Sequence, residues 1–345
     1  MRNIKTLKLY LITGLFACAL SSSAQRFDSI LSKLNSEYKQ EKLYLHFDRS
    51  VYSPGETIWF KAYLFTGNFP SLISKNIYTE LVDDKGKLLE RKVAPVLSSS
   101  AAASFDLPPN ITGQVVYVRA YTKWMLNFDS TFIFQKAIPL ATLKKTNKEP
   151  VPATISVQFF PEGGDLVQEL SSRVAFKATD ATGIPANISG DIKDSKGNKI
   201  VSFTSIHDGM GSFELFPKAG ETYKATWKDK TGKTSETPLP VAKQNGIVME
   251  VNNTSFHIEF KVKRPANVPA PYPFVYIVAQ MNQQLLYRAK ANLTKTDIAS
   301  AIIPIENLPA GIVQVTIFTP DEKPVAERIT FINKSNSFFI TDLNT

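Results

Sequence analysis

Few residues in this sequence could carry out catalysis or bind a metal. Its 345 residues include one cysteine, Cys18, and three histidines, His46, His207 and His257. The histidines are far apart and none stands in a His-x-x-x-His pattern, so a metal site would need ligands gathered from three separate regions. We interpret them as ordinary strand or turn residues, and we predict that the chain binds neither a metal nor another cofactor.

Two short segments imitate signatures of penicillin-binding enzymes, namely Ser36-Glu37-Tyr38-Lys39 and Lys230-Thr231-Gly232. That chemistry needs a serine at the start of a buried helix beside a Lys-Thr-Gly strand. Here Ser36 comes late in a short amphipathic segment, and Lys230 stands in a polar hairpin. The chain also has no Gly-x-Ser-x-Gly elbow and no phosphate-binding loop. The sequence therefore predicts a protein that is not an enzyme.

The strongest binding feature is an apolar loop over residues 124–128, between two expected strands. An exposed apolar loop is typical of an interaction surface, so Trp124, Met125 and Phe128 are the interface candidates. Other large aromatic residues, such as Trp59 and Tyr63, alternate along strands. Residues in that pattern usually fill a sandwich core or form cross-strand pairs.

The first 24 residues have the pattern of a secretory signal peptide. Three basic residues precede an apolar run over 9–20, and small residues at Ser22 and Ala24 predict cleavage after Ala24. The apolar run is too short to span a bilayer. An alternative is a lipoprotein signal ending in an acylated Cys18, which bulky Phe16 fits poorly. We predict an exported protein of the periplasm or outer membrane, held at a membrane only through a partner or a lipidated Cys18.

The predicted mature chain is mildly basic and has no cysteine. Three of the 40 Lys and Arg residues lie in the signal peptide, so 37 basic side chains face 31 acidic ones, a net charge of +6. No basic run is longer than Lys144-Lys145, which argues against a nucleic-acid partner. Without disulfides, the stability of the folded chain must come from buried cores.

Three stretches of the chain share the same landmarks in the same order, which indicates internal repeats. Each opens with an apolar-Phe-Lys strand, continues through a hairpin and a second strand, and ends with a glycine turn before a last apolar strand. The opening strands of the three repeats contain Phe60, Phe176 and Phe260.

Seven segments of the first repeat alternate apolar and polar residues or are β-branched, and Pro and Gly turns separate them. Seven short strands per repeat predict an all-β chain of tandem seven-stranded β-sandwiches. The only helical pattern lies over 25–40, where apolar residues fall on one stripe. We expect this short N-terminal helix to cover the first sandwich.

The predicted order of domains follows from these repeats and from a linker rich in Lys and Pro. It comprises a signal peptide at 1–24, the amphipathic helix at 25–40, a first sandwich at 41–143, the linker at 144–153, a second sandwich at 154–243, and a third at 246–333. Residues 334–345 read like the start of a further strand, so we expect the sequence to continue beyond them.

The segment Asp48-Arg49-Ser50-Val51-Tyr52-Ser53-Pro54-Gly55-Glu56-Thr57 resembles the opening of a macroglobulin MG2 domain. In that family, Asp-Lys/Arg-x-x-Tyr-x-Pro-Gly-Glu/Asp-Thr leads into the next strand. The segments 160–166 and 208–213 are similar to the domains that follow in Gram-negative envelope proteins of this kind. The resemblance covers 41–245 well and 246–333 loosely, and it implies macroglobulin-like, that is immunoglobulin-like, sandwiches.

The resemblance also implies a class of function. Alpha-2-macroglobulins trap proteases with a bait segment and often with a thioester formed by a cysteine, which the predicted mature chain lacks. We therefore expect a non-enzymatic envelope protein that acts as a structural or protein-interaction module. An endopeptidase-inhibitor-like role rests on the family alone. The expected partner is a protease or an outer-membrane protein. The alternative is an accessory binding module for glycan or peptide uptake, linked to a TonB-dependent transporter.

A measurement of the mature N-terminus tests the prediction of export. Expression in a Gram-negative host should give a chain that starts at Gln25, because the small residues Ser22 and Ala24 fit the cleavage rule. Intact-mass spectrometry would show this product directly. A chain that begins at Cys18 and carries the added mass of acyl groups would replace this prediction with lipid anchoring.

Overall fold

The computed structural model describes residues 22–141 and 154–334. The signal peptide as far as residue 21, the linker at 144–153 and residues 335–345 lie outside the described residues. The predicted cleavage site at Ala24 falls in the first turn of helix α2 (Ser22–Glu37), and cleavage remains a prediction. Within the described ranges, no helix has the length and apolar character needed to cross a membrane.

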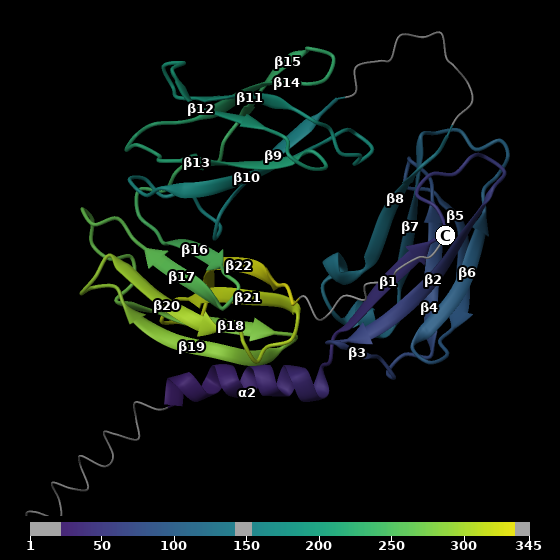
Figure 1. Ribbon diagram of the computed structural model, residues 1–345, viewed down its shortest axis with the longest axis horizontal. Helices are drawn as coiled ribbons and strands as arrows, with labels where there is room; N and C mark the ends of the chain where they lie inside the picture. Colours follow the sequence, from purple (N-terminus) through teal and green to yellow (C-terminus); the bar gives the residue numbers. More distant parts are fainter. Residues whose placement is uncertain (1–21, 142–153, 335–345) are drawn as a thin grey trace, which may run out of the picture. The chain divides into compact units, whose positions relative to one another are not determined.

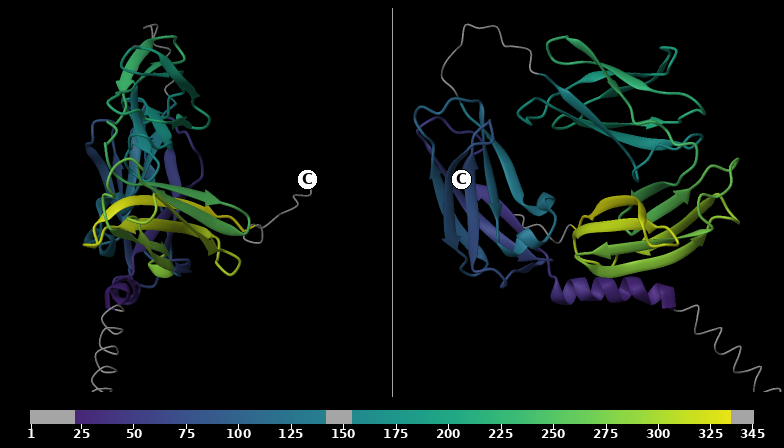
Figure 2. Two further views of the ribbon diagram at one scale, coloured as in Figure 1. Left: turned by 90° about the vertical axis from the view of Figure 1, so that its left-hand side faces the viewer. Right: turned by 180° about the vertical axis from the view of Figure 1, so that it is seen from behind.

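The described chain is nearly all β, and its strands form three sandwiches in tandem (Figure 1). This confirms the predicted fold class of tandem immunoglobulin-like sandwiches with a short N-terminal helix. Each sandwich has two antiparallel sheets, seen as separate layers in Figure 2. The domain limits drawn from the sequence remain predictions.

The first sandwich contains all seven predicted strands and one additional strand of two residues, β3. Its sheets have the orders β1-β2-β3, with β6 also paired to β2, and β5-β4-β7-β8. The strands are β1 Glu41–Phe47, β2 Thr57–Thr66, β3 Phe69–Pro70, β4 Asn76–Val82, β5 Leu88–Pro95, β6 Ser100–Asp106, β7 Val115–Tyr121 and β8 Phe134–Pro139. Two short 3-10 helices, η1 (Trp124–Asn127) and η2 (Ser130–Phe132), connect β7 to β8.

Alternation along β1 shows why these sequences form strands. Leu43, Leu45 and Phe47 are buried, and the residues between them are exposed. Successive side chains of a strand point to opposite faces, so every second residue enters the core. The buried faces of both sheets meet around Phe105, which is 0% exposed and packs 5.6 Å from the ring of Phe60.

The second sandwich packs a cluster of four phenylalanines between its sheets. The sheets have the orders β13-β10-β9 and β12-β11-β14-β15. The strands are β9 Ser156–Pro161, β10 Ser172–Thr179, β11 Ser189–Lys193, β12 Lys199–Thr204, β13 Met210–Leu215, β14 Lys224–Lys228 and β15 Thr234–Pro238. The closest ring pair, Phe176 and Phe203, is edge-to-face at 4.9 Å. Gly211 makes this packing possible, because a Cβ there would lie 2.7 Å from the Phe176 ring.

The third sandwich also has seven strands, in sheets of order β16-β17-β20 and β19-β18-β21-β22. The strands are β16 Val248–Asn253, β17 His257–Lys263, β18 Phe274–Met281, β19 Gln284–Asn292, β20 Ile298–Pro304, β21 Gly311–Phe318 and β22 Pro324–Ile332. Helix α2 and most of this sandwich form one compact unit, and the first two sandwiches belong to another.

Helix α2 packs on the third sandwich, so our expectation that it covers the first one is wrong. In Figures 1 and 2 the helix lies along the sheet β19-β18-β21-β22. The buried ring of Phe27 packs 5.5 Å from the Tyr276 ring and 4.9 Å from the Phe318 ring. Asp28 also forms an ion pair of 2.6 Å with Arg288. The apolar stripe predicted a docked helix, but it contained no information about which sheet would bind it.

Substitution of Phe27 tests the docking of the helix. Phe27→Ala removes an aromatic side chain that is 9% exposed, so we expect the attachment of α2 to weaken by about 3 kcal/mol. Amide hydrogen exchange should then speed up across α2 and change little in the first sandwich. Ser29→Ala, at an exposed position of the same helix, is the matched control. Unchanged protection of α2 in Phe27→Ala would show that the ring does not hold the helix.

Candidate functional site

The loop predicted to be an interface forms helix η1 and the residues after it. Met125 is 1% exposed and belongs to the core of the first sandwich, so its side chain is not on the surface. Trp124 and Phe128 are half-buried, with ring centroids 5.9 Å apart. Leu126, which was not among the predicted residues, is 55% exposed. The surface offered by this loop therefore consists of Leu126 and parts of the two aromatic rings.

A buried carboxylate, that of Glu41 at the start of β1, holds this loop in place. Its side chain accepts hydrogen bonds from Ser71 Oγ (2.6 Å), Ser74 Oγ (2.6 Å) and Thr122 Oγ1 (2.7 Å). A buried carboxylate without such donors would be strongly destabilising. Thr122 Oγ1 in turn accepts a bond from the Met125 backbone N–H at 3.2 Å, in the first turn of η1. Glu41 thus connects β1 to η1 through one intervening hydroxyl.

The same carboxylate brings a second apolar loop to this end of the sandwich. The loop between β3 and β4 carries Ser71 and Ser74, both bonded to Glu41, and Ile73 between them is 41% exposed. Phe69 and Leu72 are 75% and 76% exposed. We call the exposed or half-buried apolar residues of β3 and the two loops the end patch: Phe69, Leu72, Ile73, Trp124, Leu126 and Phe128.

The sequence analysis named two of the six residues of the end patch, Trp124 and Phe128. For Phe69, Leu72 and Ile73, the available signal was a glycine turn followed by an apolar segment over 69–73. No sequence pattern indicated the role of Glu41, because its hydrogen-bond donors lie 30 to 81 residues away in the chain.

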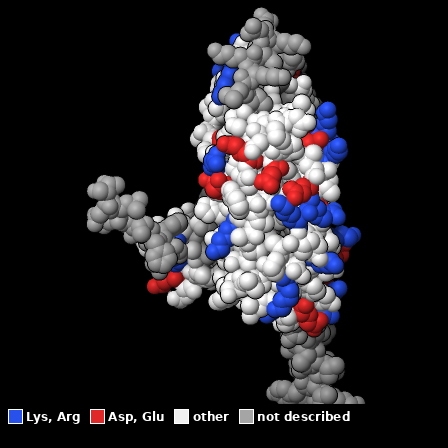
Figure 3. Space-filling view, turned by 90° about the vertical axis from the view of Figure 1, so that its right-hand side faces the viewer, with Lys and Arg blue, Asp and Glu red and all other residues white. Residues whose placement is uncertain are grey.

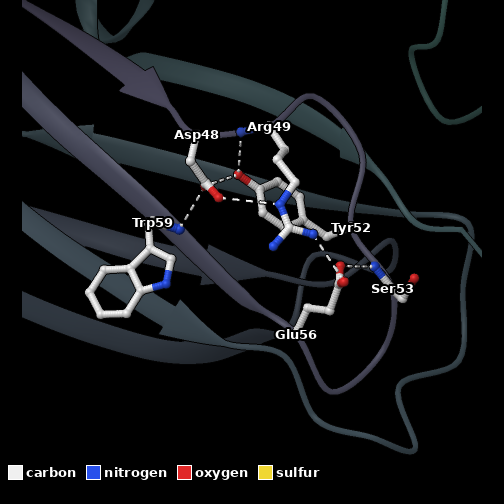
Figure 4. A network of polar contacts seen from close by, with 6 residues as sticks. All are labelled: Asp48, Arg49, Tyr52, Ser53, Glu56 and Trp59. Atoms are coloured by element: carbon white, nitrogen blue, oxygen red, sulfur yellow. Dashed lines mark hydrogen bonds and ion pairs between the residues drawn. The ribbon is translucent and has the colours of Figure 1, made fainter.

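The MG2-like segment forms a network of polar contacts around a buried tyrosine (Figure 4). Tyr52 is 1% exposed, and its hydroxyl donates to Asp48 Oδ1 at 2.5 Å. Asp48 Oδ1 also accepts from the Trp59 backbone N–H at 3.1 Å. Glu56 accepts from the Ser53 N–H at 2.7 Å and from Arg49 Nη1 at 3.0 Å. These contacts close the turn between β1 and β2.

The electrostatics of this network fit a structural role. Burial and the bond to Asp48 raise the pKa of Tyr52 to about 12. Partial burial acts to raise the pKa of Asp48, but the bonds from Tyr52 and Trp59 outweigh it and leave this pKa below its usual value. A tyrosine hydroxyl with a raised pKa keeps its proton at neutral pH and remains a hydrogen-bond donor.

A second carboxylate, Glu80 on β4, is buried beneath two arginines from neighbouring strands. Its oxygens accept from Arg91 Nε at 2.8 Å and from Arg119 Nε at 2.6 Å, and Tyr121 adds a bond of 3.1 Å. Burial acts to raise the pKa of Glu80, but the bonds from Arg119 and Arg91 outweigh it and lower this pKa. In the space-filling view, acidic and basic side chains likewise lie next to one another (Figure 3).

The three histidines lie in three different sandwiches. His46 is exposed on β1, His257 is half-buried on β17, and His207 pairs with Asp208 at 3.2 Å in an exposed turn. Among the described residues, no group of three His, Cys, Asp or Glu side chains could hold a metal ion. The Lys230-Thr231-Gly232 segment forms a hairpin turn, in which Asp229 accepts from the Thr231 N–H at 2.8 Å.

Comparisons with known proteins add little to this geometry. No family model and no curated protein matches the chain. Solved structures that resemble it include the methylamine-reacted alpha-2-macroglobulin of Salmonella, at 9% identity and a TM-score of 0.26, with coverage of 85% of this chain and 23% of that one. Trypsin-activated alpha-2-macroglobulin of Escherichia coli has 11% identity, a TM-score of 0.28 and the same two coverages.

The BSP domain of a biofilm associated protein is also similar. It has 12% identity and a TM-score of 0.27, with coverage of 89% of this chain and 70% of that one. The chain spans less than a quarter of the length of the two macroglobulins. TM-scores this low carry no argument about function.

The Glu80 cluster predicts how stability depends on pH. Because the folded-state pKa of Glu80 is lowered, the carboxylate stabilises the fold above its unfolded pKa of about 4.3, and this contribution is lost as the pH falls through the lower folded value. Glu80→Gln should therefore be less stable than the parent at pH 7, with a smaller difference at pH 3. Urea unfolding at several pH values measures this, with Asp208→Asn in an exposed turn as the control. A difference that grows toward low pH would contradict the prediction.

Proposed function

We propose that this protein is an exported, non-enzymatic module of the cell envelope that binds another protein through the end patch of its first sandwich. The observation that carries the proposal is the exposure of Phe69, Leu72 and Leu126 at 75%, 76% and 55%, on β3 and on two loops that are bonded, directly or through Thr122, to one buried carboxylate. Large apolar side chains grouped on a surface usually mark an interaction site.

The construction of the patch also favours protein binding. Glu41 bonds to Ser74 and to Thr122, so the backbone of both loops does not need to be ordered when a partner arrives. Pre-ordered contacts lower the entropic cost of association. A central apolar cluster with polar surroundings is the usual arrangement of the residues that contribute most to binding.

Two further parts of the proposal come from the sequence. The signal-peptide pattern supports a place in the periplasm or at the outer membrane. The MG2-like segment supports an envelope module of the macroglobulin kind, and a protease or an outer-membrane protein is the partner that fits it. Turnover of a substrate by the purified chain, abolished by His207→Ala, would contradict the non-enzymatic part.

Site-specific crosslinking in intact envelopes tests the end patch. A photo-crosslinking amino acid at position 72 or at position 126 should capture the same partner, because Ser74 and Thr122, close to these positions in the chain, both bond to Glu41. The same amino acid at position 200 is the matched control, since Ile200 is 43% exposed but lies in the second sandwich. No adduct at 72 and 126, or the same adduct at 200, would overturn the proposal.

Charge substitution measures the strength of the contact. The double variant Leu72→Asp, Leu126→Asp should weaken binding of the captured partner by roughly 30-fold or more, since central apolar contacts usually dominate an interface. Its unfolding midpoint should change little, because both side chains are exposed. Unchanged affinity in a folded double variant would show that the end patch does not bind.

A further inference from the structure

A cavity of about 360 Å³ lies between helix α2 and the sheet β19-β18-β21-β22 of the third sandwich. This volume is within the range of small-molecule sites, which are mostly apolar and contain a few polar groups. Most of the lining is apolar and comes from both walls: Phe27, Ile30, Leu31 and Leu34 from the helix, and Val278, Phe318 and Pro324 from the sheet.

The residues that line the cavity follow helix α2, and those at one end are aromatic. The helical residues that line it run from Phe27 to Leu34, a distance of about 10 Å along the helix axis. At the Phe27 end, the rings of Phe318 and Tyr276 pack against the Phe27 ring. An apolar chain would fit along the helix with its apolar end toward these rings.

The sheet also supplies a polar group further along the same strands. Gln314 lies four residues from Phe318 on β21, about 13 Å away along the strand. Its Nε2 donates to Glu327 Oε2 at 2.6 Å, and Thr316 Oγ1 donates to the same oxygen at 3.0 Å. Both donors are neutral, so neither compensates the charge of the Glu327 carboxylate.

The charges around the cavity are acidic. Of the described residues that line it, Glu322 and Glu327 are acidic and none is basic. Glu322 pairs with Arg26 at 3.1 Å, which leaves Glu327 as the acidic group for a ligand. Glu327 is exposed at the rim of the cavity, so a ligand whose apolar part lies in the cavity can place a positive charge beside this carboxylate.

We propose that this cavity is a binding site for an apolar molecule that carries an amine, with the apolar part along α2 and the ammonium group at Glu327. The site is in the third sandwich, and it is independent of the end patch of the first. It also gives α2 a role, because the helix forms one wall of the site.

Three probes that share one alkyl chain test the choice of head group. Octylamine, octanol and octanoate should bind the full mature chain in that order of affinity, as measured by isothermal titration calorimetry. An ion pair with the exposed Glu327 carboxylate should give the amine an advantage of about threefold over the alcohol. Equal affinities for the three probes, or octanoate binding most tightly, would overturn the proposal.

Two kinds of variant identify the site. Glu327→Gln should reduce octylamine affinity to that of octanol and leave octanol unchanged. Leu31→Phe and Val278→Phe fill the cavity from opposite walls, so either variant should weaken all three probes. Glu90→Gln, on β5 of the first sandwich, is the control and should bind as the parent does. An amine preference retained in Glu327→Gln, or binding retained in a folded cavity-filled variant, would show that the probes bind elsewhere.

Discussion

Each sandwich depends on the burial of one face of two short-stranded sheets against each other. The predicted mature chain has no cysteine, so no disulfide helps to hold the sheets together. Apolar packing at about 25 cal/mol per Å² of buried surface must therefore supply the stability. Gly211 shows how tight this packing is, because even one added carbon there would meet the Phe176 ring and the Thr204 carbonyl.

The alternation that buries these faces is also what made the fold predictable. Leu43, Leu45 and Phe47 are read from the sequence as one face of a strand, and the structure buries all three. The helix was predictable for the same reason, from its apolar stripe. Its docking site was not, because the contacts of Phe27 with Tyr276 and Phe318 join residues about 250 and 290 positions apart. Periodicity describes which face is buried and says nothing of the partner that covers it.

Burying a carboxylate is costly, and the two buried carboxylates of the first sandwich are compensated in different ways. Glu80 is compensated by Arg91 and Arg119, whose guanidinium groups remain about half exposed and cover it from neighbouring strands. Glu41 is bonded by hydroxyl and backbone donors of neutral residues. The pairing of Glu80 follows from cross-strand positions on β4, β5 and β7, so it is a local feature of one sheet. Glu41 instead joins three separate segments, which is why its substitution would affect loops as well as strands.

Because of this difference, Glu80 contributes mainly to the stability of its sheet, whereas Glu41 also determines the position of surface loops. A cross-strand ion cluster such as that of Glu80 mainly stabilises the sheet that contains it. A buried carboxylate that organises two loops determines where their exposed side chains stand, as Glu41 does for Leu72 and Leu126. Apolar side chains at the surface gain nothing for the isolated fold, since water still contacts them. Rigid support beneath an exposed apolar surface therefore supports the proposal that a partner covers it.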